Sequence, residues 1–275
     1  MINMLKQFFN IIKALPFLIL AYIYLNIGYY FYKSSDSDSD KIRVKYTNLF
    51  YYYLFKTFKY GIRSQIIYLK NTKINLEKVT IINANHYVQD DIFILFDLLE
   101  QNNIEGKCMS SISTSHGIDD FDKKILQISN SAMVNNTIED ISNIKNQINF
   151  WKKRDYNTLM ITFFEGITLK DSKEKSKKFK NLLDPKSLGF ELCLKNIESK
   201  YIYDLNLVYS YNGKLLSATD FSTLYLFHPS TKIYVSVSKY ELPDLKYAKE
   251  WLNELYLRKD KEIMDIQNKF NLSLY

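Results

Sequence analysis

The chain has 275 residues, of which 47% are hydrophobic and 16% aromatic, with only 7 Gly and 4 Pro. This composition excludes a disordered chain, because there is ample apolar surface to bury, and the length permits one or two domains. The net charge of +7 indicates an anionic partner, for which acidic lipid head groups and nucleic acid are the two candidates. Cys108 and Cys193 are too few and too far apart to predict a disulfide scaffold or a metal site.

The N-terminal segment, residues 1–33, is predicted to be a membrane anchor. There is no charged residue from Ala14 to Tyr32, and about 19–20 helical residues span a hydrocarbon core about 30 Å thick. Tyrosines gather towards the C-terminal end, as in an aromatic belt at a membrane surface. A cleaved signal peptide is disfavoured because no small-residue cleavage site follows. A buried or membrane-surface helix stays open, since Asn26 interrupts the apolar run.

The segment after the anchor changes character abruptly. Residues 34–43 begin with alternating Ser and Asp and contain no apolar run, so we expect an acidic linker. In Val44–Leu69, aromatic and aliphatic side chains recur near helical spacing among lysines. This pattern predicts an amphipathic helix, lying either on the membrane surface or against a protein core. Together with the residues that follow, this helix is expected to belong to one globular domain, residues 44–275.

Strands and helices alternate along the rest of the chain, which predicts an α/β domain with a mixed, mainly parallel sheet flanked by helices. Apolar runs rich in β-branched residues predict strands, and apolar residues at helical spacing predict helices. The expected strands are Ile66–Leu69, a run starting at Val79, Lys107–Ser115, Ala132–Val134, Asn157–Phe164, Asn206–Tyr211 and Lys232–Ser238; the expected helices are Ile92–Leu99, Phe121–Ser129, Ile138–Lys153, Ser187–Glu198 and Leu245–Phe270.

The stretch Val79–Glu100 predicts a strand, a tight turn and a helix, with His86 in the turn and Asp91 in the first helical turn. A carboxylate is favoured there by the helix dipole, and the turn can fold the imidazole back towards it. Asp91 would then hold one ring N–H and leave the other nitrogen as a base. The structural alternative is that Asp90 or Asp91 caps the helix while His86 fills a polar turn.

A second site-like arrangement follows the buried strand at Asn157–Phe164. The strand runs directly into Glu165 and Gly166, so that the sheet fixes the carboxylate while glycine allows a close backbone approach to a ligand. A Glu-Gly pair after a strand is also common in ordinary turns.

Taken together, these motifs resemble the glycerolipid acyltransferase family, which includes lysophosphatidic acid and lysocardiolipin acyltransferases. Asn85, His86 and Asp91 are similar to the family's Asn-His-x4-Asp motif, and Phe163–Ile167 is similar to its Phe-Pro-Glu-Gly-Thr motif. The order of further segments resembles the lysocardiolipin/lysophospholipid branch from Val79 to Trp251. These segments are Lys175–Phe179, Asp184–Phe190, Asn206–Tyr209 and Tyr240–Pro243.

The chain departs from the family pattern at several positions. Phe164 replaces Pro and Ile167 replaces Thr in the Glu-Gly motif, and the Pro of the last motif is missing. Where the second motif has an Arg for the acceptor's phosphate, the alignment places Val134-Asn135-Asn136. A lysine cluster could supply the missing positive charge from the other side of the acceptor's phosphate, or it could be a solvated loop. The cluster comprises Lys170, Lys173, Lys175, Lys177, Lys178 and Lys180.

The resemblance implies transfer of a fatty acyl group from acyl-CoA to a lysophospholipid hydroxyl, with acyl-CoA as co-substrate and no metal or other cofactor. His86 would be the general base, oriented by Asp91, and Asn85 would position the turn. Glu165 and Gly166 would bind the acceptor through a hydroxyl contact and a backbone N–H, with Lys175, Lys177 and Lys178 near the phosphate. Residues 44–275 would be the catalytic domain, at an intracellular membrane such as the endoplasmic reticulum.

The main rival is a catalytically silent lipid-binding protein of the same fold, which the departures from the motifs favour. Nucleic-acid binding ranks third and is not expected, because only charge and aromatic content support it. His116 and His228 are interpreted as loop histidines. No Gly-x-Ser-x-Gly nucleophile elbow is present, which argues against a serine hydrolase. The sequence does not indicate the oligomeric state or the membrane topology.

Overall fold

A computed structural model describes residues 2–33, 37–61, 64–104, 108–114, 120–134, 139–154, 157–173 and 176–273. Within these residues, eight strands form one sheet in the order β1-β8-β6-β2-β5-β3-β4, with β7 paired to β6. The strands are β1 (Gln65–Lys70), β2 (Val79–Ala84), β3 (Cys108–Thr114), β4 (Ala132–Val134), β5 (Thr158–Thr162), β6 (Tyr201–Tyr211), β7 (Lys214–Leu215) and β8 (Thr231–Glu241).

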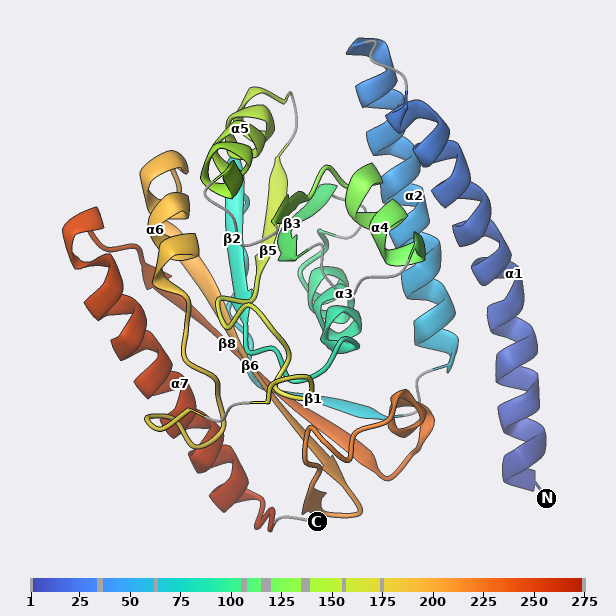
Figure 1. Cartoon of the computed structure of the whole chain (residues 1–275). Coiled ribbons are helices and arrows are strands. Elements are labelled where there is room, and N and C mark those ends of the chain that lie inside the picture. The colour runs from blue at the N-terminus through green and yellow to red at the C-terminus, as the bar shows by residue number, and fades with distance from the viewer. Residues whose placement is uncertain are drawn as a thin grey trace.

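The sheet is mainly parallel, as predicted. All pairs are parallel except those of β6 with β8 and β7. Helices cover both faces (Figure 1): α5 (Glu139–Lys153), α6 (Ser187–Asn196) and α7 (Ala248–Lys269) on one, and α2 (Ser37–Gly61) with α3 (Asp91–Gln101) on the other. Helix α4 (Asp120–Ile128) and the short 3-10 helices η1 (Thr223–Phe227) and η2 (Leu245–Tyr247) complete the body.

Each central strand divides its side chains between two cores. In β2, Ile82 packs in the core under α3, whereas Ile81 packs in the core under α5, α6 and α7. The same alternation, which follows from the pleat of a strand, runs along β6. Tyr209 therefore faces α3, while Asp204 faces α7, where it contacts Lys259. The two faces of β6 thus present different chemistry to the two layers of helices.

Helix α1 (Ile2–Tyr32) lies along α2 at the outer edge of the molecule (Figure 1). Its buried Ala21 and Leu25 pack in one cluster with Phe50 of α2 and Ile128 of α4, whereas Ile19 and other apolar side chains are exposed. Among the described residues, one helix is long and apolar enough to cross a membrane by length and composition, and it is the Ile12–Tyr32 part of α1.

Helix α2 begins earlier than the sequence predicted. Residues 34–36 lie outside the described residues, but Ser37–Asp40, expected in an acidic linker ending at residue 43, are helical. The reason is Arg43, which is buried, pairs with Asp40 and donates to the carbonyl oxygen of Ile128 at 3.2 Å. The first turns of α2 thereby supply a cation to the C-terminal end of α4, where the helix dipole favours one. The division into anchor, linker and catalytic domain stays a prediction.

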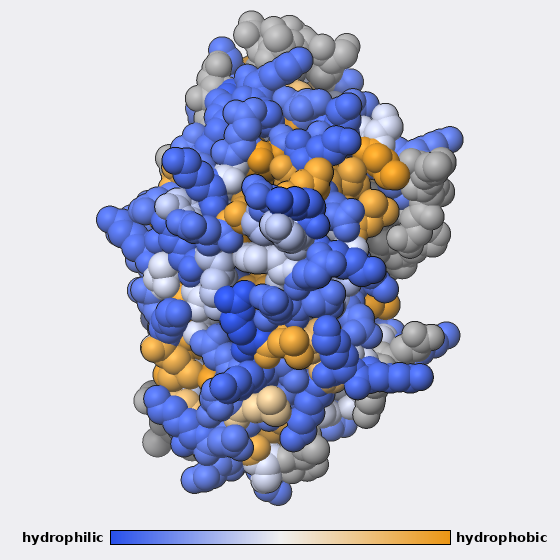
Figure 2. Space-filling view, turned by 90° about the vertical axis from the view of Figure 1, so that its left-hand side faces the viewer, coloured by the Kyte–Doolittle hydropathy of each residue, from blue (hydrophilic) through white to orange (hydrophobic). Residues whose placement is uncertain are grey.

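The outer surface on the α7 side is mostly hydrophilic, with scattered apolar patches (Figure 2). Helix α7 contributes exposed charged residues such as Glu254 and Lys261 to this surface and buries Leu252, Leu255 and Ile263. The helix is therefore amphipathic in the way its spacing predicted, with the sheet on its apolar side.

Trp151 of α5 provides a test of the core beneath α5, α6 and α7. The side chain is fully buried and its indole N–H donates to the carbonyl oxygen of Asn130 at 2.9 Å. Trp151→Ala is expected to lower the free energy of unfolding by about 3–5 kcal/mol in urea denaturation of the detergent-solubilised protein. The neighbouring Phe150, 38% exposed, is the control, and Phe150→Ala is expected to cost less than about 1 kcal/mol. Equal losses for the two variants would contradict this assignment of the core.

Candidate active site

Two turns that are distant in the sequence meet at one edge of the sheet. Strands β2 and β5 are parallel neighbours, with Asn83 opposite Thr162 near their ends. The turn that holds Asn85 and His86 and the turn that holds Phe163 and Glu165 therefore leave the sheet side by side. In open α/β sheets this carboxyl edge is where ligands bind.

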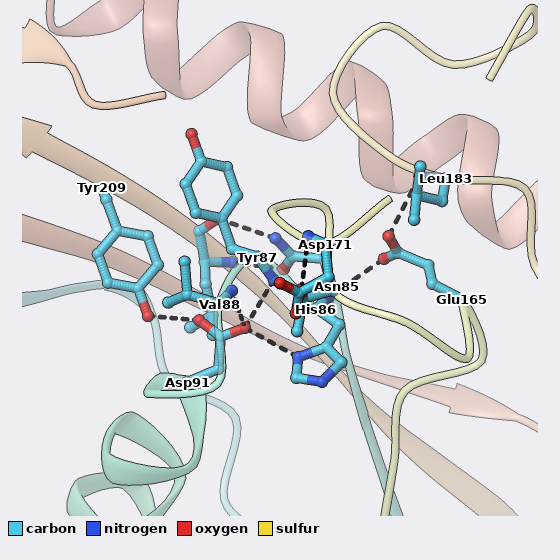
Figure 3. Close-up of polar contacts among 11 residues, drawn as sticks. Asn85, His86, Tyr87, Val88, Asp91, Glu165, Asp171, Leu183 and Tyr209 are labelled. Atoms are coloured by element: carbon cyan, nitrogen blue, oxygen red, sulfur yellow. Dashed lines mark hydrogen bonds and ion pairs between the residues drawn. The ribbon is translucent and has the colours of Figure 1, made fainter. Parts of the chain in front are cut away.

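The carboxylate of Asp91 lies at the centre of the site and is fully buried (Figure 3). One oxygen, Oδ1, accepts a hydrogen bond from the Tyr209 hydroxyl at 2.6 Å. The other, Oδ2, accepts from the backbone N–H groups of Tyr87 at 2.6 Å and Val88 at 3.0 Å. The same oxygen is 3.3 Å from Nδ1 of His86. A buried charge is tolerated only with such a set of partners, and here they hold the turn around His86 in one conformation.

His86 is oriented from three sides. Asp91 can only accept, so the contact assigns the ring proton to Nδ1 and leaves the lone pair on Nε2, on the far side of the ring. The Phe163 ring stacks on the imidazole, with centroids 3.9 Å apart and planes inclined by 19°. The backbone N–H donates to Glu165 Oε1 at 3.2 Å. The side chain is 15% exposed, so solvent or a ligand can reach it.

Asn85 joins the turn to β6. Its Nδ2 donates to the carbonyl oxygen of Leu207 at 3.0 Å, and its Oδ1 accepts from the N–H of the same residue at 2.8 Å. Asn85 thus extends the β2–β6 pairing by one step beyond the last strand residue and fixes where His86 leaves the sheet. The side chain is buried, and its contribution to substrate binding stays a prediction.

Glu165 acts as a clamp between two loops in this structure. Its carboxyl group is buried, and Oε1 and Oε2 accept from the N–H groups of His86 and Leu183, at 3.2 and 3.1 Å. Burial raises the pKa of Glu165 to about 8, although these two hydrogen bonds lower it. Because both oxygens are engaged with the backbone, direct binding of an acceptor hydroxyl by Glu165 stays a prediction.

Gly166 has a backbone conformation that favours glycine, with φ of +78°. Its N–H donates to the carbonyl oxygen of Phe163 at 2.9 Å and so closes the turn. The N–H that we expected to face the acceptor is therefore used within the turn, and the role of Gly166 here is to allow the turn that presents Glu165.

The lysines that were expected near the acceptor's phosphate lie in different surroundings from one another. Lys175 lies outside the described residues, as does His116, and Lys177 is exposed. Lys178 donates to Asn253 of α7 at 3.3 Å, which holds it at that helix. Lys170 lies nearer the turn of His86: its backbone N–H donates to the carbonyl oxygen of Tyr87 at 3.2 Å, and its ammonium donates to that of Phe221 at 2.9 Å. The charge of Lys170 also acts to lower the pKa of Asp90, which burial raises.

Sequence reasoning missed the role of Tyr209, although it predicted a strand at Asn206–Tyr211, the second half of β6. The tyrosine donates to Asp91 across 118 positions of sequence and stacks on Tyr87 with ring centroids 5.3 Å apart. The signal lay in the alternation of β6, which places Tyr209 on the face that meets α3. Among the described residues, no group of three or more His, Cys, Asp or Glu side chains is placed to hold a metal ion.

Comparison with known proteins gives little beyond this geometry. No protein-family model matches the sequence, and no curated protein matches it. The solved structures that resemble this chain include the crystal structure of the 1-acyl-sn-glycerophosphate (LPA) acyltransferase PlsC from Thermotoga maritima. The two chains are 15% identical, the match covers 94% of this chain and 98% of that one, and the TM-score is 0.48. At this level of similarity the functional argument rests on the site's own residues.

The raised pKa of Glu165 makes the stability of the protein depend on pH. The unfolded chain loses this proton near pH 4.5 and the folded chain near pH 8, so stability is lost as pH rises across that window. We expect the free energy of unfolding of the wild type to fall by on the order of 3–5 kcal/mol from this group. In urea denaturation at a series of pH values, Glu165→Gln should remove the part of the fall in the free energy of unfolding that comes from Glu165.

Glu254→Gln, at an exposed position of α7, is the matched control and should follow the wild-type curve. Parallel wild-type and Glu165→Gln curves between pH 4.5 and 8 would show that the folded pKa of Glu165 is not raised.

Proposed function

We propose that the chain is an acyltransferase that moves a fatty acyl group from acyl-CoA to a free hydroxyl of a lysophospholipid. The observation that supports this best is the contact of His86 Nδ1 with the fully buried Asp91 carboxylate, which leaves Nε2 as the unprotonated nitrogen of a side chain that is 15% exposed. This is the arrangement of a histidine base held in one tautomer by a carboxylate.

The reaction would be a direct transfer without an acyl-enzyme. Nε2 of His86 takes the hydroxyl proton of the acceptor as its oxygen attacks the thioester carbonyl, and a tetrahedral intermediate forms. When that intermediate collapses, the carbon–sulfur bond breaks and the imidazolium returns its proton to the departing thiolate of CoA. The buried charge of Asp91 stabilises the imidazolium that exists between the two proton transfers.

The remaining residues would support this base. Asn85 and Glu165 hold the backbone on the two sides of His86, and Phe163 fixes the plane of its ring. Lys170 is a candidate for the acceptor's phosphate, because its loop contacts the turn of His86. The exposed apolar side chains of α1 would keep the site near the membrane in which both amphiphilic substrates reside.

The decisive experiment is an acyl-transfer assay on the purified full-length chain, with labelled acyl-CoA and a panel of lysophospholipids that differ in head group. His86→Ala should lower kcat/KM by about 10²–10⁴-fold, because the transition state loses its base. His228→Ala is the control, since His228 is exposed and its Nδ1 accepts from the N–H of Ser230. Lipid binding without transfer in the wild type would favour the silent lipid-binding protein, and full transfer by His86→Ala would rule out this base.

A second experiment tests which lysine meets the acceptor's phosphate. Lys170→Met should raise KM for a phosphate-bearing acceptor roughly tenfold with little change in kcat, because a charge-assisted contact common to ground state and transition state is lost. Lys178→Met is the comparison, as this ammonium contacts Asn253. A larger rise for Lys178→Met than for Lys170→Met would assign the phosphate to the segment of Lys175, Lys177 and Lys178, as the sequence predicted.

A further inference from the structure

The segment between β7 and β8 carries the most exposed large apolar side chain of the described residues. This side chain is Leu224 in η1, and it is 76% exposed. A single exposed leucine is common in soluble proteins, so exposure alone indicates no function. Two further features distinguish Leu224: the segment that presents it is firmly packed, and that segment contacts both the α1–α2 pair and the candidate site.

The residues on either side of Leu224 are packed into the protein. Phe221 and Leu226 are buried in the core under α3. The hydroxyl oxygen of Ser222 accepts from the N–H of Leu224 at 3.4 Å and so caps η1. Because the chain is held on both sides, the leucine is fixed at the surface on a rigid turn.

A chain of contacts connects this segment to α1. The carbonyl oxygen of Leu226 accepts at 3.1 Å from the N–H of Ser64, just beyond α2. Near that end of α2, the ring of Tyr60 stacks on Phe17 of α1, with ring centroids 5.2 Å apart. Figure 1 shows the segment, in orange, just below the C-terminal end of α2. Leu224 therefore belongs to the part of the surface that borders α1 and α2.

The side chains in this part of the surface suit a lipid bilayer. On α1, Leu15 and Ile19 are exposed and belong to the stretch that is long and apolar enough to cross a membrane. Tyr60 of α2 is also exposed and has an apolar ring with a polar tip, a kind of side chain enriched at membrane–water boundaries. Leu224 adds a further apolar group beside them.

The same segment is bonded to the turn that carries His86. The Thr223 hydroxyl donates to Oδ2 of Asp90, the N-cap residue of α3, at 2.8 Å. The hydroxyl of Tyr87 donates to the carbonyl oxygen of Leu216. Whatever surface η1 contacts is therefore held next to the turn of the candidate base.

We propose that η1 is a membrane contact, in which the Leu224 side chain inserts into the lipid–water boundary of the bilayer beside α1. Because η1 is bonded to the His86 turn, this insertion places that turn at the membrane surface, where a lysophospholipid acceptor resides. The consequence for catalysis rests on the proposed function; the insertion does not.

The competing explanations are that Leu224 contacts a second copy of this chain or only water. A tryptophan at this position distinguishes them. Bromine atoms on lipid acyl chains quench tryptophan fluorescence only at short range, so a tryptophan inserted among lipids is quenched. A tryptophan in a protein interface or in water keeps its fluorescence.

The test uses Leu224→Trp in the full-length chain, reconstituted into vesicles of phosphatidylcholine and phosphatidylglycerol with brominated acyl chains. The wild-type signal comes from Trp151 and Trp251, which pack in the core under α5, α6 and α7, and it is subtracted. We expect the added tryptophan to be quenched more by bromine near the head group than near the chain end. The reason is that an interfacial side chain reaches only about 5–10 Å into the bilayer.

Leu257→Trp is the matched control. Leu257 is 46% exposed on α7, which covers the other face of the sheet, so its added tryptophan should keep its fluorescence. Equal quenching in the two variants, or none in Leu224→Trp, would overturn the proposal. An emission from Leu224→Trp that depends on protein concentration and not on lipid would also overturn it and assign Leu224 to an interface between copies.

A kinetic experiment tests the consequence for catalysis. Leu224→Asp should raise KM about tenfold for a lysophospholipid presented in vesicles, because the inserted apolar group is lost. KM for a short-chain lysophospholipid dissolved as monomers should change little. Leu257→Asp is the control and should leave both values of KM unchanged. Equal rises for the two acceptors in Leu224→Asp would show that Leu224 acts within the protein and would contradict a membrane role.

The quenching experiment needs no substrate, so its failure differs from a failure of the proposed function. If Leu224→Trp is quenched but the wild type transfers no acyl group, the membrane contact stands and the enzymatic role falls. If His86-dependent transfer is found without quenching, the enzymatic role stands and the membrane contact falls.

Discussion

The site depends on the burial of one carboxylate. Asp91 has no contact with water, so donors must reach it from within the protein, and they come from the turn that carries His86 and from Tyr209 on β6. Because the turn's own N–H groups are among those donors, its path is fixed by the same interaction that orients the imidazole. The geometry of the base is therefore a consequence of satisfying a buried charge.

A second level of order comes from the sheet. Parallel pairing of β2 with β5 sets the two turns side by side, and Glu165 then bridges them by accepting from His86 and from Leu183. Neither turn alone has this geometry. The site thus combines local hydrogen bonds around Asp91 with a long-range contact between two turns that the strand order places together. The buried ion pair of Lys259 with Asp204 is connected to both turns by hydrogen bonds.

The sequence predicted those parts of the fold that local periodicity encodes. Apart from β7, the strands and most helices followed from spacing. The contact of His86 with Asp91 followed too, because these two residues belong to one strand, turn and helix. Tyr209 could not be paired with Asp91 without the strand order, and the early start of α2 depended on Arg43 meeting α4. The burial of Lys259 could have been predicted from its position, which continues the apolar spacing of Leu252, Leu255, Tyr256 and Ile263. A lysine in a helix with many charged residues is, however, normally predicted to be exposed.

The alternation of β6 has a consequence for how this chain tolerates changes in length. Between Asp204 and Tyr209 the strand serves α7 from one side and α3 from the other, so loss or gain of a single residue there would exchange the two sides for everything beyond it. The ion pair of Lys259 with Asp204 and the hydrogen bond from Tyr209 to Asp91 could not then both form. We therefore expect changes in chain length to be tolerated only outside these six positions of β6, which must keep their number to serve both layers of helices.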